Sequence, residues 1–160
     1  MTRLCLCMLA LLIAVPAAVP TASAQGTSFL VVPGRSLGPV AIGMRLEAVE
    51  SVLGKPSKVD PNGRTQWYEW KAPDNRFRSI AVETLQNTVV LISLAHDPRY
   101  RTSQGIGDGT ALADVERTLG QPSSVMRLGG FSIVQYRRIG IGFVTDGSGR
   151  VTGIIVAPGV

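Results

Sequence analysis

Residues 43–59 read GMRLEAVESVLGKPSKV, and residues 109–125, 66 positions later, read GTALADVERTLGQPSSV. Nine of the seventeen positions are identical: Gly43/Gly109, Leu46/Leu112, Val49/Val115, Glu50/Glu116, Leu53/Leu119, Gly54/Gly120, Pro56/Pro122, Ser57/Ser123 and Val59/Val125. Stretches of ordinary composition share only about one position in seventeen by chance. The sequence therefore predicts a duplicated structural unit.

The repeated stretch has the pattern of a short amphipathic helix. In the first copy one helical face carries Leu46, Val49, Val52 and Leu53. Gly54 ends this helix and Pro56 prevents its continuation. The N-terminal end lacks a good capping side chain, because Arg45 occupies that position in the first copy and Ala111 in the second. A helix of two turns is not stable alone, so it must pack on the rest of the chain.

Each predicted helix is followed by segments rich in β-branched and aromatic residues. These segments are 65–71, 78–84 and 88–94 in the first copy, and 131–136, 140–145 and 150–156 in the second. Turn sequences such as Asn62-Gly63 separate them. We therefore expect an α+β fold of two tandem repeats, each a short helix followed by a three-stranded antiparallel meander, with the helices packed on one sheet face. The repeats span about 28–97 and 98–160 of a single compact domain, 25–160.

The first 24 residues have the pattern of a secretory signal peptide. Arg3 supplies the positive charge, residues 4–15 are apolar, and Ala22-Ser23-Ala24 provides the small residues of a cleavage site. The apolar run is shorter than the roughly 20 residues of a transmembrane helix. We expect a periplasmic or secreted protein, cleaved after Ala24, with no transmembrane anchor after cleavage.

The sequence offers few residues for catalysis or metal binding. Both cysteines, Cys5 and Cys7, lie in the leader, and His96 is the only histidine. Without an acid–base pair, an activated nucleophile or a set of metal ligands, we expect no enzymatic activity, no cofactor and no metal. The net charge is +5, but the arginines are scattered, so we do not predict nucleic-acid binding.

The aromatic segment 65–71 is the strongest candidate for a binding surface. Strand alternation places Tyr68 and Trp70 on one face and Trp67 on the other. Trp67 is either exposed among arginines, as a partner-binding hot spot, or packed under the other repeat. Both alternatives remain open at this point. The candidate partner-binding residues are Trp67, Arg76, Arg78, Arg99, Tyr100 and Arg101.

The start of the repeated unit also resembles a known family. The residues that carry the resemblance are Ile42-Gly43-Met44, Leu46, Val49, Leu53-Gly54 and Pro56. They resemble the opening of the SmpA/OmlA (BamE-like) envelope domains, small periplasmic domains that take part in outer-membrane protein assembly. The tandem arrangement resembles the β-lactamase-inhibitor-protein fold, in which two such units form a concave sheet that grips a partner.

Together, the residues and the resemblance predict a non-enzymatic envelope protein. It would bind another envelope or secreted protein through an exposed β-sheet face, in outer-membrane assembly or maintenance. Two alternatives stay open. One is a secreted inhibitor of an enzyme that uses the same surface, and the other is a small-molecule or peptidoglycan-binding accessory domain.

Overall fold

The computed structural model describes residues 29–160, so the predicted signal peptide lies outside the described residues. Its main element is an antiparallel sheet of eight strands in the order β4-β5-β6-β7-β12-β11-β10-β9. These strands are β4 (Lys58–Asn62), β5 (Thr65–Ala72), β6 (Asn75–Leu85), β7 (Thr88–Ala95), β9 (Ser124–Leu128), β10 (Phe131–Tyr136), β11 (Ile141–Asp146) and β12 (Val151–Val156). A second sheet contains β1 (Leu30–Val32), β2 (Ser36–Leu37), β3 (Val40–Ala41) and β8 (Arg101–Thr102). The helices are α1 (Leu46–Leu53), α2 (Leu112–Leu119) and the 3-10 turn η1 (Arg137–Ile139).

The predicted α+β class, with a three-stranded meander after each helix, is wrong. The described chain is mostly β-structure: each α-helix is followed by four strands of the large sheet, and four short strands form a second sheet. The missed strands of the large sheet are β4 and β9, its two edges. Edge strands lack the alternation of buried and exposed side chains that marks a strand in sequence, and β4 also contains Pro61.

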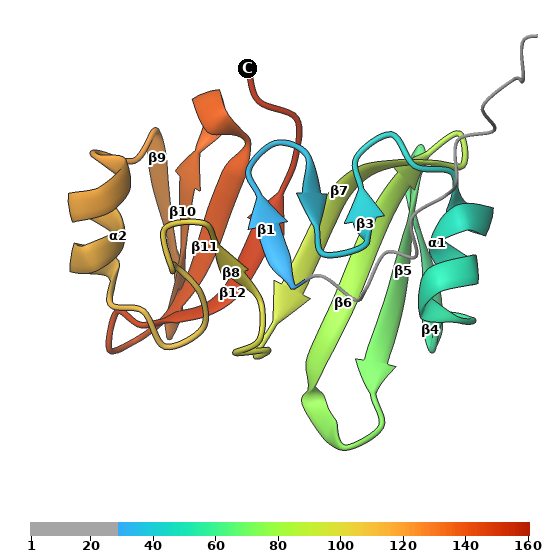
Figure 1. The fold of residues 1–160 in the computed structure, drawn as a ribbon, viewed down its shortest axis with the longest axis horizontal. Coiled ribbons are helices and arrows are strands. Elements are labelled where there is room, and N and C mark those ends of the chain that lie inside the picture. The colour runs from blue at the N-terminus through green and yellow to red at the C-terminus, as the bar shows by residue number, and fades with distance from the viewer. Residues whose placement is uncertain (1–28) are drawn as a thin grey trace, which may run out of the picture.

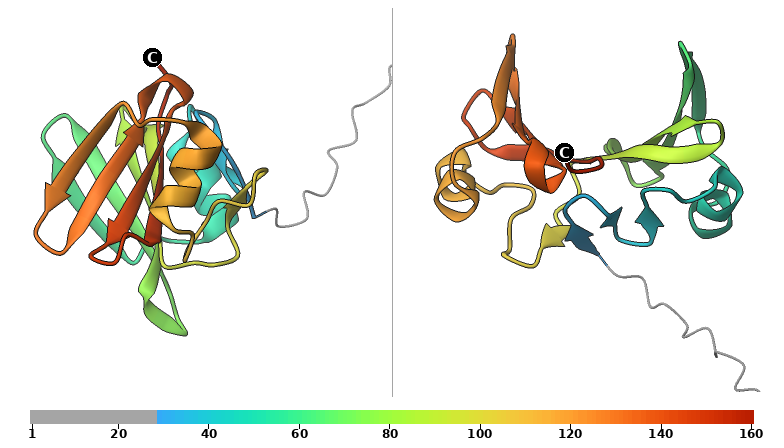
Figure 2. Two further views of the ribbon diagram at one scale, coloured as in Figure 1. Left: turned by 90° about the vertical axis from the view of Figure 1, so that its left-hand side faces the viewer. Right: turned by 90° about the horizontal axis from the view of Figure 1, so that it is seen from above.

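The large sheet is strongly curved, and only one of its faces is covered. Helices α1 and α2 lie on the convex side, with the small sheet between them (Figures 1 and 2). The buried core lies between these layers and includes Val49 of α1, Val115 of α2, Leu37 of the small sheet, and Ile92 and Phe143 of the large sheet. The helices therefore pack on the convex face of the sheet, and the concave face stays uncovered.

The C-terminal ends of the two helices are held by equivalent contacts. The indole Nε1 of Trp70 donates a hydrogen bond to the carbonyl of Gly54, with a donor–acceptor distance of 2.8 Å. The hydroxyl of Tyr136 donates to the carbonyl of Gly120 at 3.2 Å. A core aromatic side chain thus satisfies a carbonyl that the end of a short helix leaves unpaired.

The N-terminal ends lack side-chain caps, as expected from Arg45 and Ala111. Backbone turns supply the missing acceptors instead. The amide of Leu46 donates to the carbonyl of Asn87 at 3.1 Å, and the amide of Leu112 donates to that of Gly149 at 2.8 Å. These acceptors come from hairpin turns far along the chain, so the helices depend on tertiary contacts.

The two halves join where β7 pairs with β12 at the centre of the large sheet. This antiparallel pairing places Gly153 opposite Ala95 and Ile155 opposite Ser93. A Cβ atom on Gly153 would lie 2.8 Å from the carbonyl oxygen of Leu94 and 3.3 Å from the Cβ of Val144. Only glycine fits at this central position without moving backbone.

We predict that Gly153→Ala destabilises the fold, whereas Gly142→Ala on the neighbouring strand has a much smaller effect. A Cβ on Gly142 would make a contact of 3.4 Å with the carbonyl oxygen of Val134, which is close to ordinary packing distance. Overpacking of this kind costs roughly 1–3 kcal/mol of unfolding free energy. Urea denaturation of both variants measures the difference. Equal stabilities would contradict a steric requirement at Gly153.

Candidate functional site

The concave face of the eight-stranded sheet, called the trough from here on, is the main candidate site. It is the uncovered side of the curved sheet, with one wall formed by each half of the chain (Figure 2, right panel). Side chains alternate along each strand, so residues next to the core positions Tyr68 and Trp70 point into the trough. This uncovered face of the sheet is therefore accessible to a partner.

A groove of about 340 Å³ lies at the centre of the trough. Its floor consists of small residues from β6, β7 and β12: Ser79, Ala81, Ser93, Ala95 and Gly153. Trp67 and Glu69 flank this floor on the side of the first half, and Val144 and Ile155 flank it on the side of the second. Residues of both halves therefore build one concavity.

Trp67 is half-buried and points into this groove. Its register partners are Asp60 on β4 and Glu83 on β6, so carboxylates flank it rather than the expected arginines. The Glu83 carboxylate accepts hydrogen bonds from Asn62 and Thr65. Trp67 is therefore neither fully exposed nor packed under the other half. Its indole is partly exposed and lines a groove that both halves form.

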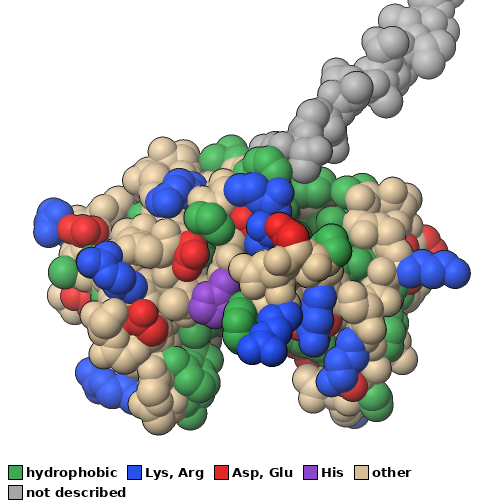
Figure 3. Space-filling model, turned by 90° about the horizontal axis from the view of Figure 1, so that it is seen from below, with side chains coloured by type: hydrophobic (Ala, Val, Ile, Leu, Met, Phe, Trp, Pro, Cys, Tyr) green, Lys and Arg blue, Asp and Glu red, His purple; other side chains and the backbone are tan. Residues whose placement is uncertain are grey.

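The second half gives the trough an apolar wall. Met126 and Leu128 of β9 and Phe131 of β10 are 55%, 41% and 43% exposed, and all three point to the concave side. Ile133 and Val144 continue this surface toward the centre of the sheet. The hollow between the two lobes is visible from below, with hydrophobic side chains gathered on the wall of one lobe (Figure 3).

The apolar wall was not predicted from the sequence. In a strand over 124–128, Met126 and Leu128 share one face while Val125 and Arg127 share the other. No strand was predicted there from the sequence, so this apolar face was not recognised. The segment begins only two residues after Pro122, which marks the end of the predicted helix, and no strand was predicted that close to it.

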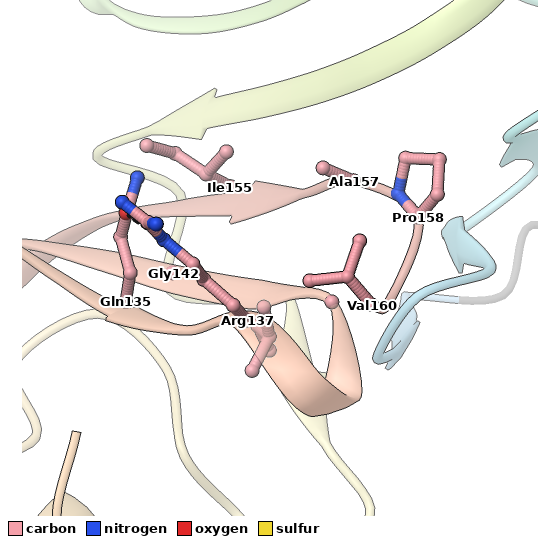
Figure 4. A pocket seen from close by; sticks show the side chains of 9 residues that line it. Gln135, Arg137, Gly142, Ile155, Ala157, Pro158 and Val160 are labelled. Atoms are coloured by element: carbon pink, nitrogen blue, oxygen red, sulfur yellow. Dashed lines mark hydrogen bonds between the residues drawn. The ribbon is translucent and has the colours of Figure 1, made fainter. Parts of the chain in front are cut away.

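A small pocket of about 220 Å³ extends the trough toward the C-terminal segment (Figure 4). Its lining includes Ile155, Ala157, Pro158 and Val160, with Gln135 and Arg137 at its side. The Nε of Arg137 donates to the Oε1 of Gln135 at 3.1 Å. Because Ile155 lines both this pocket and the central groove, the two are adjoining parts of one surface.

Three of the predicted site residues lie on the convex side instead. Arg78 and Arg99 both contact the carboxylate of Asp97, which is 2% exposed. Arg99 Nε and Nη2 donate to the two oxygens of Asp97 at 2.9 and 2.6 Å, and Arg78 Nε lies 3.6 Å from Oδ2. Tyr100 is buried and packs edge-to-face on Phe29, with ring centroids 5.1 Å apart.

The remaining two predicted residues lie elsewhere again. Arg76 is exposed on the β5–β6 hairpin, with its guanidinium 4.7 Å from the centroid of the Phe77 ring. Arg101 donates to the carbonyl of Gly105 at 2.9 Å and so closes a local loop. The structure thus places Trp67 in the trough and does not bring the other five candidates to it.

The Asp97 carboxylate is held in its charged form. Burial opposes its ionisation, but hydrogen bonds from the side chain and backbone of Arg99 outweigh this and lower the pKa of Asp97 below its ordinary value. Because the folded-state pKa is the lower one, the charged group stabilises the fold above the ordinary pKa of about 3.9. That contribution is lost as the pH falls through the folded-state pKa.

We predict that Asp97→Asn lowers the unfolding free energy at pH 7 by roughly 1–3 kcal/mol, since it leaves charged donors without their acceptor. The difference from the unmodified protein should shrink below about pH 4. Asp74→Asn is the matched control, because it removes only an exposed pair with Arg78, worth about 0–1 kcal/mol. Denaturation curves between pH 3 and 8 test this, and a pH-independent difference would contradict it.

Two further findings concern the described residues. In 29–160, no group of three or more His, Cys, Asp or Glu side chains is placed to hold a metal ion. Within the same residues, no helix is long and apolar enough to cross a membrane.

The fold is a curved antiparallel sheet covered on one face, and its similarity to known proteins is found in structure alone. In sequence, the chain matches no protein-family model and no curated protein. The resemblance to SmpA/OmlA domains therefore gains no support.

Several solved structures are similar to this chain in fold. A DUF4309 family protein from Bacillus subtilis superposes with a TM-score of 0.58 at 12% identity, over 78% of this chain and 88% of that one. An extracellular SCP-domain protein from Bacillus anthracis gives 0.53 at 13% identity, over 73% and 44%. A cysteine-rich secretory protein from Staphylococcus aureus gives 0.50 at 13% identity, over 73% and 44%. This chain therefore spans less than half the length of the last two proteins, and the likeness concerns the fold.

A structure from Streptococcus mutans, described as a putative beta-lactamase inhibitor protein, also matches this chain. It superposes at 14% identity over 72% of this chain and 83% of that one. Its TM-score of 0.32 is too low to carry an argument about fold or function.

Proposed function

We propose that this chain is an exported, non-enzymatic protein that binds another protein of the envelope or extracellular space through the trough. The observation that carries the proposal is that one concave surface presents both a half-buried tryptophan, Trp67, and an exposed apolar wall. That wall consists of Met126, Leu128 and Phe131. Exposed apolar patches on soluble proteins mark interaction surfaces, and tryptophan is enriched among residues that dominate binding energy.

One further observation supports the proposal. The similar structures from B. anthracis and S. aureus are described as extracellular or secretory proteins, which agrees with the signal-peptide pattern.

The partner can be identified by photo-crosslinking in cells. A photoreactive phenylalanine analogue at Met126 should crosslink the partner, whereas the same analogue at Val52, exposed on α1 across the sheet, should not. Outer-membrane assembly components among the products would support that finer role. If the crosslinked partner is an enzyme that the purified protein inhibits on titration, the inhibitor function is favoured. Capture of peptidoglycan fragments would favour the function of a peptidoglycan-binding accessory domain. Equal products at both positions would contradict binding through the trough.

We predict that Trp67→Ala weakens binding of the captured partner by about 30-fold, the loss expected for a hot spot of roughly 2 kcal/mol. The melting temperature should change little, because the indole packs on one side only. Val52→Ala serves as the control and should leave affinity unchanged. A large fall in melting temperature for Trp67→Ala would instead assign this side chain to the stability of the fold.

A further inference from the structure

The two edges of the large sheet are built from equivalent segments of the repeat but differ in chemistry. Residues 58–62 of β4 read KVDPN, and residues 124–128 of β9 read SVMRL. Val59 and Val125 are shared, and both are exposed. At the other four positions, β4 carries lysine, aspartate, proline and asparagine, whereas β9 carries serine, methionine, arginine and leucine.

The β4 edge is protected against an added strand. Pro61 has no amide hydrogen to donate and disrupts a ladder. Lys58 and Asp60 form an exposed ion pair on the trough side of β4, which an added strand would have to desolvate. Natural sheets use proline and charges of this kind to prevent edge-to-edge association.

The β9 edge, Ser124–Leu128, has neither a proline nor an ion pair on its trough side, and its charged residue, Arg127, lies on the convex side. Within the described residues β9 pairs with β10 alone, so its outer backbone groups face solvent. Its side chains are apolar on both faces, with Met126 and Leu128 on the trough side and Val125 on the convex side. Only an added strand, which extends both sheet faces at once, would cover all three.

Arg127 indicates the charge of that strand. It is exposed on the convex side beside Val125 and Leu112, where a groove of about 290 Å³ runs along the sheet edge. Among residues 29–160 its guanidinium has no hydrogen-bond or ion-pair partner. A second copy of this basic chain would bring another Arg127 to the same edge, whereas an acidic side chain would complement it.

We propose that the β9 edge accepts an extended segment of a partner protein as an additional strand, with apolar side chains on the trough side and acidic side chains beside Arg127. This mode is β-strand addition, in which backbone hydrogen bonds supply affinity and alternate side chains supply specificity. It goes beyond binding through the trough, because it uses the sheet edge and does not require Trp67.

The test uses two fluorescently labelled, end-blocked octapeptides, one alternating valine with glutamate and one alternating valine with lysine. The protein should bind the glutamate peptide at least about tenfold more tightly. Arg127→Glu should reverse this preference. N-methylation of the amides on one edge of the glutamate peptide should abolish binding, because it removes the ladder donors. Unchanged binding on N-methylation, or no preference between the peptides, would overturn the proposal.

The chain supplies its own matched control in β4. With Met126→Asp, Arg127→Pro and Leu128→Asn, residues 126–128 become identical to residues 60–62 of β4. This triple variant should keep the circular dichroism spectrum but no longer bind the peptide. If the triple variant does not fold, Met126→Lys alone takes its place in the test, with the same expected loss of peptide binding. The Trp67→Ala variant should bind the peptide as tightly as the unmodified protein. Strand addition at β9 can therefore be tested independently of partner binding through the trough. Sedimentation showing a dimer that the triple variant abolishes would assign the edge to a second copy and overturn the proposal.

Discussion

The pairing of β7 with β12 is the constraint on which the rest of the molecule depends. It joins two four-stranded meanders into one sheet, so that each half extends the surface of the other. Gly153 makes this joint possible, because a side chain there would meet the carbonyl of Leu94. The helices and the small sheet then bury one face, and the trough is what remains open.

One-sided burial explains why the two sheet faces differ so strongly in chemistry. On the convex side, the charges of Asp97 and Arg99 satisfy each other beside the buried ring of Tyr100. On the concave side, apolar side chains such as Met126 remain exposed without a structural need. Burial therefore accounts for the first set, and the partner binding that we propose would account for the second.

Duplication also separates what folding requires from what function requires. The positions shared by both copies form helix faces, glycine ends and core aromatics that hold those ends, such as Trp70 and Tyr136. The copies differ at the sheet edges and along the trough walls. Folding places the same physical demands on both copies, and the surfaces where they differ are those through which we propose that a partner binds.

The sequence by itself determined both helices with their glycine ends and six of the eight strands of the large sheet. These features follow from local periodicity and from turn residues, which operate within a few positions. Only the tertiary structure decided the class of the fold, because β4, β9 and the small sheet exist through pairing with distant segments. It also decided the site, since curvature and register brought Trp67 beside Val144 and Ile155. The same geometry placed Arg78 and Arg99 on the opposite side, against Asp97.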